Sequence, residues 1–222
     1  MEDHPFTSLA ALEEYGENTY ATLMYMTLAS LSVRSVDWDH LASHVGKACG
    51  IVATLRGIPV LAAPSKPIQS PSGMNVGNTK APALLLPLDI MAGSGVQEED
   101  VFRHGPDAEG LQDAVFKVAT RANDHLITAR EMLENLKAGK SLGHDFEHEG
   151  ETGHVYSPEE PISSGSRSEQ ALRERAFGVL LEGIPARDYL ARLEKANFDP
   201  FRVKSSWNLP WQLWRASSRQ QI

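Results

Sequence analysis

Apolar residues return every three or four positions over several long segments of the chain, which is the period of a helix with one buried face. This pattern predicts long helices over about 9–31, 37–56 and 108–136. The predicted buried stripe of the first helix consists of Leu12, Tyr15, Thr19, Leu23, Met26 and Ala29. The stripe of the third consists of Leu111, Val115, Val118, Ala122, Leu126, Ala129 and Leu133. Ser8 stands where an N-cap residue would open the first helix.

Shorter patterns of the same period predict helices from 86 to about 93–95, over 171–181 and over 186–195, and a last helix around three tryptophans. Because no segment alternates apolar and polar residues with the period of a strand, the predicted fold class is all-α. Trp207, Trp211 and Trp214 recur at helical spacing, which favours packing of the last helix against the core. Seating of these indoles at a membrane interface is the alternative.

Two segments lack this periodicity and are rich in Pro, Ser and Gly, at about 57–80 and 140–168. Such a composition predicts loops rather than packed elements. The chain has 222 residues, of which 41% are hydrophobic, so it can bury one sizeable core. We therefore expect a single domain over 1–222 with loop insertions at these two places.

The overall charge narrows the class of partner. A formal net charge of −8 and a pI near 5.5 argue against nucleic-acid binding, which requires a basic face. The lone Cys49 cannot form an internal disulfide and is typical of a reduced core thiol. No apolar run approaches the roughly 20 residues that a membrane-spanning helix needs. The first residues lack the Arg-rich character of a mitochondrial presequence, so we expect any targeting segment to be absent from this form.

The most informative segment runs from Gly46 to Leu61, and it resembles the second metal-binding helix of squalene and phytoene synthases. The positions that match that helix are Gly46, Ala48, Ile51, Leu55 and Arg56. Where the synthases have carboxylates, this chain has Gly57, Val60 and Leu61. No acidic residue occurs in the whole segment.

The loss of these acids bears directly on chemistry. Breaking an allylic diphosphate releases a pyrophosphate anion, whose charge magnesium stabilises while it is held by carboxylates on facing helices. The acids upstream of Gly46 form no D-x-x-x-D pair that would supply the other cluster. We therefore expect no bound metal or other cofactor.

Further phrases resemble one branch of the squalene/phytoene synthase superfamily, whose members assist the assembly of mitochondrial respiratory complex I. The matching phrases lie at 12–19, 39–52, 86–90, 95–100 and 198–201. The resemblance implies an isoprenoid-synthase-like helical bundle, truncated at its N-terminus relative to the family. It also implies a non-catalytic protein at the matrix side of the mitochondrial inner membrane. Its expected partners are complex I subunits or assembly intermediates, with peripheral contact to the membrane.

Two other functions remain open at this point. One is a head-to-head prenyl-diphosphate transferase whose first acidic motif lies outside this chain. The other is a carrier that keeps an apolar cavity for a lipid or isoprenoid but has lost the reaction. In either case Tyr15, Asn18 and Thr19 are candidates to line the remains of a substrate cavity or to bind a partner. The same side chains could instead bridge helices.

His40, His44 and Arg56 complete the set of candidate site residues. The two histidines lie one helical turn apart and could ligate a transition metal with Asp37, or they could form a polar helix edge at the rim of the cavity. Arg56 follows the position of the synthase motif and could meet a phosphate, or it could pair with an acid at the helix end.

Overall fold

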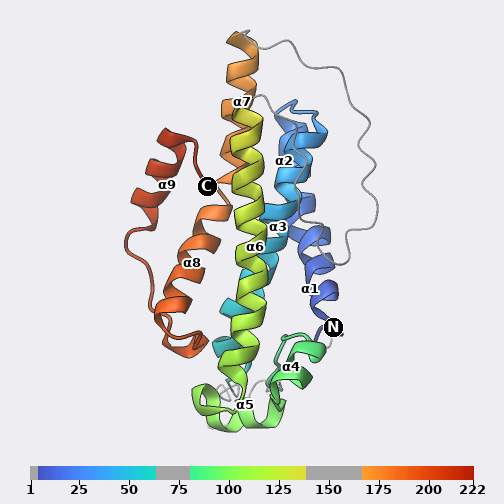
Figure 1. Ribbon diagram of the computed structural model, residues 1–222, viewed down its shortest axis with the longest axis vertical. Coiled ribbons are helices and arrows are strands. Elements are labelled where there is room, and N and C mark those ends of the chain that lie inside the picture. Colours follow the sequence, from blue (N-terminus) through green and yellow to red (C-terminus); the bar gives the residue numbers. More distant parts are fainter. Residues whose placement is uncertain (1–4, 64–80, 139–166) are drawn as a thin grey trace, which may run out of the picture.

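The structure is a computed structural model that describes residues 5–63, 81–138 and 167–222 (Figure 1). Its α-helices are α1 (Leu9–Gly16), α2 (Thr22–Ser30), α3 (Val36–Leu61), α4 (Leu88–Ser94), α5 (Glu98–His104), α6 (Leu111–Lys137), α7 (Arg167–Leu180), α8 (Gly183–Lys195) and α9 (Leu209–Arg219). A π-helix at Glu17–Ala21 joins α1 to α2, and 3₁₀ turns lie at Gly105–Asp107 and Pro200–Arg202. No strand occurs in these ranges, which confirms the predicted all-α class.

Helices α3 and α6 pack against each other through the middle of the bundle (Figure 1). Helices α1 and α2 lie on one side of this pair, and α8 and α9 lie on the other. Every residue of the predicted α6 stripe is buried, from Leu111 to Leu133. This prediction is confirmed because a 27-residue helix in contact with neighbours on one side shows its period over many turns.

The predicted first loop begins too early. Helix α3 continues to Leu61 through Pro59, so residues 57–61 are helical. Burial of Ile58, which is 1% exposed, holds this turn against the core despite the backbone hydrogen bond that Pro59 cannot donate. Residues 64–80 and 139–166 lie outside the described part of the chain, and α7 already begins at Arg167.

The predicted buried stripe of the first helix is wrong after its first member. Leu12 is fully buried, but Tyr15, Leu23 and Met26 are 42%, 59% and 57% exposed. The π-helix explains the difference, because its wider turn inserts one residue and shifts the buried face. The buried positions are Leu12, Gly16, Ala21, Met24 and Leu28.

Small residues allow this shifted face to approach α3 very closely. A Cβ added to Gly46 would lie 2.5 Å from the Cα of Ala21, and one added to Gly50 would lie 2.6 Å from the Cα of Gly16. Both distances are shorter than side-chain contacts permit, so two backbones meet here without room for a side chain. The helix-breaking tendency of Gly46 and Gly50, about 1 kcal/mol each, is offset by this packing.

Helix α9 is anchored to the bundle through polar contacts. The Asp188 carboxylate of α8 accepts hydrogen bonds from Gln212 Nε2 at 2.7 Å and from Ser206 Oγ at 3.2 Å. Near the other end of α9, Arg130 Nε donates to the carbonyl oxygen of Ile222 at 2.9 Å. These contacts fix the orientation of α9 from both ends.

The prediction that the tryptophans pack on the core is wrong. Trp207, Trp211 and Trp214 are 92%, 56% and 67% exposed. The inner face of α9 is formed instead by Leu209, Leu213 and Ala216, which contact the apolar cluster under α7. Among the described helices, none has the length and apolar character needed to cross a membrane.

Candidate functional site

Five polar side chains form a continuous hydrogen-bonded chain through the core. His40 Nε2 lies 3.2 Å from His44 Nε2, and His44 Nδ1 lies 3.0 Å from His125 Nδ1. His125 Nε2 lies 2.7 Å from Glu13 Oε1, which also accepts a hydrogen bond from Arg121 Nε. We call these residues the histidine chain. It joins α1, α3 and α6, whose contributing residues are up to 112 positions apart.

The histidine chain lies where two apolar clusters meet. On α3, His44 follows Leu41 of one cluster and precedes Ala48 of the other. On α6, His125 stands between Ala122 and Ala129, which belong to different clusters. His44 is 0% exposed and His125 is 1% exposed. A polar layer of this kind favours one register of α3 against α6, because a slipped register would bury imidazoles without partners.

The partners of the histidine chain determine its proton arrangement when all three imidazoles are neutral. A carboxylate only accepts, so His125 must carry hydrogen on Nε2 and accept on Nδ1. His44 must then donate from Nδ1 and accept on Nε2. His40 must donate from Nε2. The hydrogen bonds therefore all run in one direction, from the half-buried His40 to Glu13.

The same geometry limits the charge that the histidine chain can hold. One added proton can rest on any of the three rings if the tautomers of the others rearrange. A second added proton has no such place. Either His44 would have to lose its own proton and accept on both nitrogens, or two N–H groups would point at each other in one of the contacts between rings. We infer that the three imidazoles can share at most one positive charge without losing a buried hydrogen bond.

Glu13 is the anionic end of the chain. Burial alone would raise the pKa of its carboxyl, but the hydrogen bonds and positive charges of His125 and Arg121 lower that pKa to about 2. Glu13 is therefore ionised at neutral pH and is already neutralised by its neighbours. A second acid, Glu17, is engaged one turn later: it accepts hydrogen bonds from Tyr25 and from Ser43 at 2.6 Å, and its carboxylate lies 3.9 Å from Lys47 Nζ.

The sequence-predicted residues on the first helix do not join the histidine chain. Tyr15 is 42% exposed and stacks against Phe6 with ring centroids 5.3 Å apart. Asn18 is exposed, and the half-buried Thr19 donates to the carbonyl oxygen of Tyr15 in its own helix. These three side chains lie on the outer side of the bundle.

The two predicted histidines do lie together, but neither earlier interpretation describes them fully. His44 is not part of a polar helix edge, because it is fully buried and both ring nitrogens have histidine partners. Among the described residues, no group of three or more His, Cys, Asp and Glu side chains has an arrangement that could hold a metal ion.

The end of α3 contains Gly57, Val60 and Leu61, which the sequence resemblance predicts to stand where the synthases have carboxylates. Arg56 is exposed. Burial raises the pKa of the Tyr20 and Tyr189 hydroxyls, and the positive charge of Arg56 lowers both pKa values in part. Val60 is 76% exposed, while Gly57 and Leu61 are half-buried. None of these side chains can coordinate a magnesium ion.

Sequence reasoning missed Glu13, Arg121 and His125. A signal existed for His125, which interrupts the apolar stripe of α6 between Ala122 and Ala129. A signal also existed for Glu13, since Glu13 and Glu17 are four residues apart on a helix. Neither signal indicates the partner, because that depends on helices distant in the sequence.

The structure is an all-α helical bundle of the isoprenoid-synthase-like class. The family model described as squalene/phytoene synthase matches residues 1–215, and the chain belongs to this family.

Several relatives that resemble the chain have the same name, complex I assembly factor 6. The chain is 37% identical to "NADH dehydrogenase (ubiquinone) complex I, assembly factor 6 homolog" of Drosophila melanogaster over 60% of this chain and 35% of that protein. It is 27% identical to the assembly factor 6 of Mus musculus over 100% of this chain and 51% of the relative. It is 26% identical to the assembly factor 6 of Homo sapiens over 90% of this chain and 44% of the relative. The chain thus spans about half the length, or less, of these relatives. No solved structure matches the chain.

Proposed function

We propose that this protein acts, without catalysing a reaction, in the assembly of mitochondrial respiratory complex I. The observation that carries the proposal is membership of the squalene/phytoene synthase family together with relatives that are named complex I assembly factor 6. In this role the protein binds complex I subunits or assembly intermediates at the matrix side of the inner membrane, with peripheral contact to the membrane.

Two observations support a pseudoenzyme. The positions of the second synthase motif carry Gly57, Val60 and Leu61, which offer no oxygen ligand for magnesium. The acids that face α3 from the first helix are already engaged, Glu13 by Arg121 and His125, and Glu17 by Ser43 and Tyr25. Binding of a diphosphate and its metal ions would require these contacts to break.

The outer side of the first helical segment is the proposed partner surface. Tyr15, Leu23 and Met26 are large, exposed and placed at helical spacing, with Asn18 and Thr19 between them. Exposed apolar side chains that share one helix face commonly mark a protein interface. The π-helix produces this surface, because its extra residue turns Ala21, Met24 and Leu28 toward the bundle and leaves Leu23 and Met26 on the outer side.

Genetic rescue tests the proposal. The protein is expressed in Drosophila cells lacking their assembly factor 6 homolog, and complex I is measured by native gel electrophoresis and NADH oxidation. Wild-type protein should restore complex I, whereas Leu23→Ala with Met26→Ala should restore less than about a tenth of it, provided both alanine variants accumulate equally. The matched control is Val60→Ala with Leu88→Ala, which shortens exposed apolar side chains elsewhere and should rescue fully.

A second measurement distinguishes assembly from prenyl chemistry. Farnesyl and geranylgeranyl diphosphate analogues are titrated into the full-length protein with and without magnesium in a calorimeter. No magnesium-dependent heat is expected. Magnesium-dependent binding followed by turnover of a prenyl diphosphate would overturn the pseudoenzyme proposal, and a lipid that co-purifies with the protein would instead indicate a carrier.

A further inference from the structure

The exposed tryptophans of α9 form an ordered surface. Trp207, Trp211 and Trp214 follow one another at intervals of four and three residues, so they share one side of the helix and its entry turn. Leu209, Leu213 and Ala216 pack another side of α9 on the bundle, and Asp188 binds Gln212 of α9 and Ser206 of the segment before it. The indoles are therefore presented outward by a fixed helix.

A cationic groove runs beside these indoles, between α8 and α9. It has a volume of about 440 Å³ and is lined by Arg187, Trp211, Gln212, Arg215, Ala216, Arg219 and Gln221. Arg215 lies over the ring of Trp211, with its guanidinium carbon 5.3 Å from the ring centroid. Three guanidinium groups and an indole thus line one open groove.

Positive charges lie close to one another around Arg187 in this groove. Burial lowers the pKa of Arg187, and the charges of Arg130 and Arg215 lower it further. The nearby negative charge of Asp188 raises the pKa of Arg187, but the Asp188 carboxylate already accepts hydrogen bonds from Arg192 and Gln212. In the described part of the structure, none of the three groove arginines is within ion-pair distance of a carboxylate.

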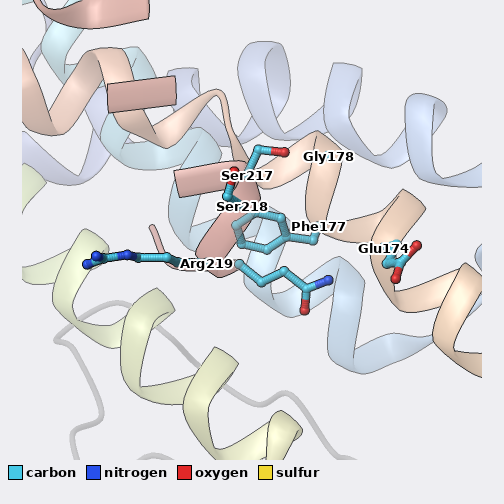
Figure 2. Close-up of a pocket in the computed structure, with 7 residues that line it drawn as sticks. Glu174, Phe177, Gly178, Ser217, Ser218 and Arg219 are labelled. Carbon is cyan, nitrogen blue, oxygen red and sulfur yellow. The ribbon is translucent and has the colours of Figure 1, made fainter. Parts of the chain in front are cut away.

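A neighbouring groove does not supply the missing anion. It lies between α7 and α9 and is lined by Glu174, Phe177 and Gly178 from α7 and by residues 217–220 at the end of α9. Figure 2 shows the guanidinium of Arg219 directed away from Glu174. The one acid of that groove therefore leaves Arg219 available to the cationic side.

The charge of the surrounding sequence extends this feature. Residues 195–222 contain five basic side chains and one acidic side chain, although the whole chain has a net charge of −8. The single acid, Asp199, is 1% exposed and is paired with Arg202 at 2.9 Å. An anionic surface would attract this end of the molecule and repel the rest, which fixes one orientation of approach.

We propose that α9 is a membrane-docking element: the arginines of the α8–α9 groove bind the phosphate groups of anionic phospholipids, and the three exposed indoles enter the headgroup region. Arginine forks match phosphate oxygens, and tryptophan has an established preference for the membrane–water interface. This docking element would make the peripheral membrane contact of the proposed function, and it rests on the proposed function only for that contact. The proposed protein-partner surface lies elsewhere, on α1 and α2.

Vesicle flotation tests the docking surface. The full-length protein is mixed with vesicles of phosphatidylcholine, or of phosphatidylcholine and phosphatidylglycerol in equal amounts, and the floated fraction is measured at low and high salt. Wild-type protein should float with the anionic vesicles only, and less at high salt. Arg215→Gln with Arg219→Gln should weaken partitioning by about tenfold or more, as should Trp207→Ala with Trp214→Ala.

Matched controls separate the surface from general effects. Arg34→Gln with Arg103→Gln removes two exposed positive charges elsewhere, and Val60→Ala with Leu88→Ala removes exposed apolar surface elsewhere. Both should float like wild type. Equal flotation of the arginine pair variants, or of wild type with both kinds of vesicle, would overturn the inference. Binding of inorganic phosphate with no flotation would also overturn it, in favour of a soluble anion.

The outcome is independent of the assembly test. If wild-type protein restores complex I but does not float with anionic vesicles, the membrane-docking inference fails and the assembly function stands. If it floats as expected but does not restore complex I, the assembly proposal fails while α9 remains a lipid-binding element.

Discussion

The Nδ1 atoms of His44 and His125 lie 3.0 Å apart in the buried contact between α3 and α6. Two like atoms can share this hydrogen bond only if one is protonated and the other is not. The Glu13 carboxylate settles which one, because it requires hydrogen on the far nitrogen of His125. A contact between α1 and α6 thereby sets the tautomer of a residue on α3.

Removing one member of the histidine chain should destabilise the fold more than removing an exposed histidine. His125→Leu removes one of the two side chains that donate to Glu13 and leaves the His44 N–H without its acceptor in a buried site, which should cost about 2–4 kcal/mol of unfolding free energy. Denaturant unfolding measures this cost. His104→Gln, on an exposed side chain, is the control and should change stability by less than about 0.5 kcal/mol. Combination with His44→Leu should cost less than the sum of the two.

Glu13 should give the protein an acid-sensitive stability. Its pKa is lowered from 4.5 to about 2 in the fold, so its contribution is fully present above about pH 4.5 and is lost as the pH falls toward 2. That contribution is on the order of 3 kcal/mol. Unfolding free energy measured across this range should fall less steeply for Glu13→Gln than for wild type. Glu14→Gln, at an exposed position, should keep the wild-type slope.

The close helix approach at Gly46 should not tolerate a methyl group. Gly46→Ala would place a Cβ 2.5 Å from the backbone of Ala21, so the π-helix and α3 must separate, at a cost of about 2–3 kcal/mol. Gly178→Ala, within α7 and with nothing inside 4 Å, should instead stabilise by up to about 1 kcal/mol. Thermal unfolding of the two variants compares them directly. An equal effect of both substitutions would contradict the packing.

Asp188 should control the attachment of α9. Asp188→Ala removes the acceptor for Gln212, Ser206 and Arg192, so the helix and its preceding segment should detach locally more often. Limited proteolysis after Lys204 should become about tenfold faster, since the opening would cost about 1.4 kcal/mol less. Asp113→Ala, at an exposed position on α6, should leave the cleavage rate unchanged.

The sequence by itself determined the helices whose period is long and unbroken. The buried face of α6 follows from the spacing of apolar residues, and the close approach at Gly46 and Gly50 follows from their lack of a side chain. The absence of carboxylates at Gly57, Val60 and Leu61 is likewise a property of the sequence alone. These features are local, so a linear pattern contains them.

Tertiary structure decided the rest. The π-helix at Glu17–Ala21 depends on packing against α3, and it reversed which residues of the first helix are buried. Glu13 and His125 are 112 residues apart, and no local pattern specifies that they meet. Trp207, Trp211 and Trp214 are exposed because α9 packs on distant segments through Leu209, Leu213 and Ala216. Each is a pairing between distant segments, and its energy exists only once both segments are in place.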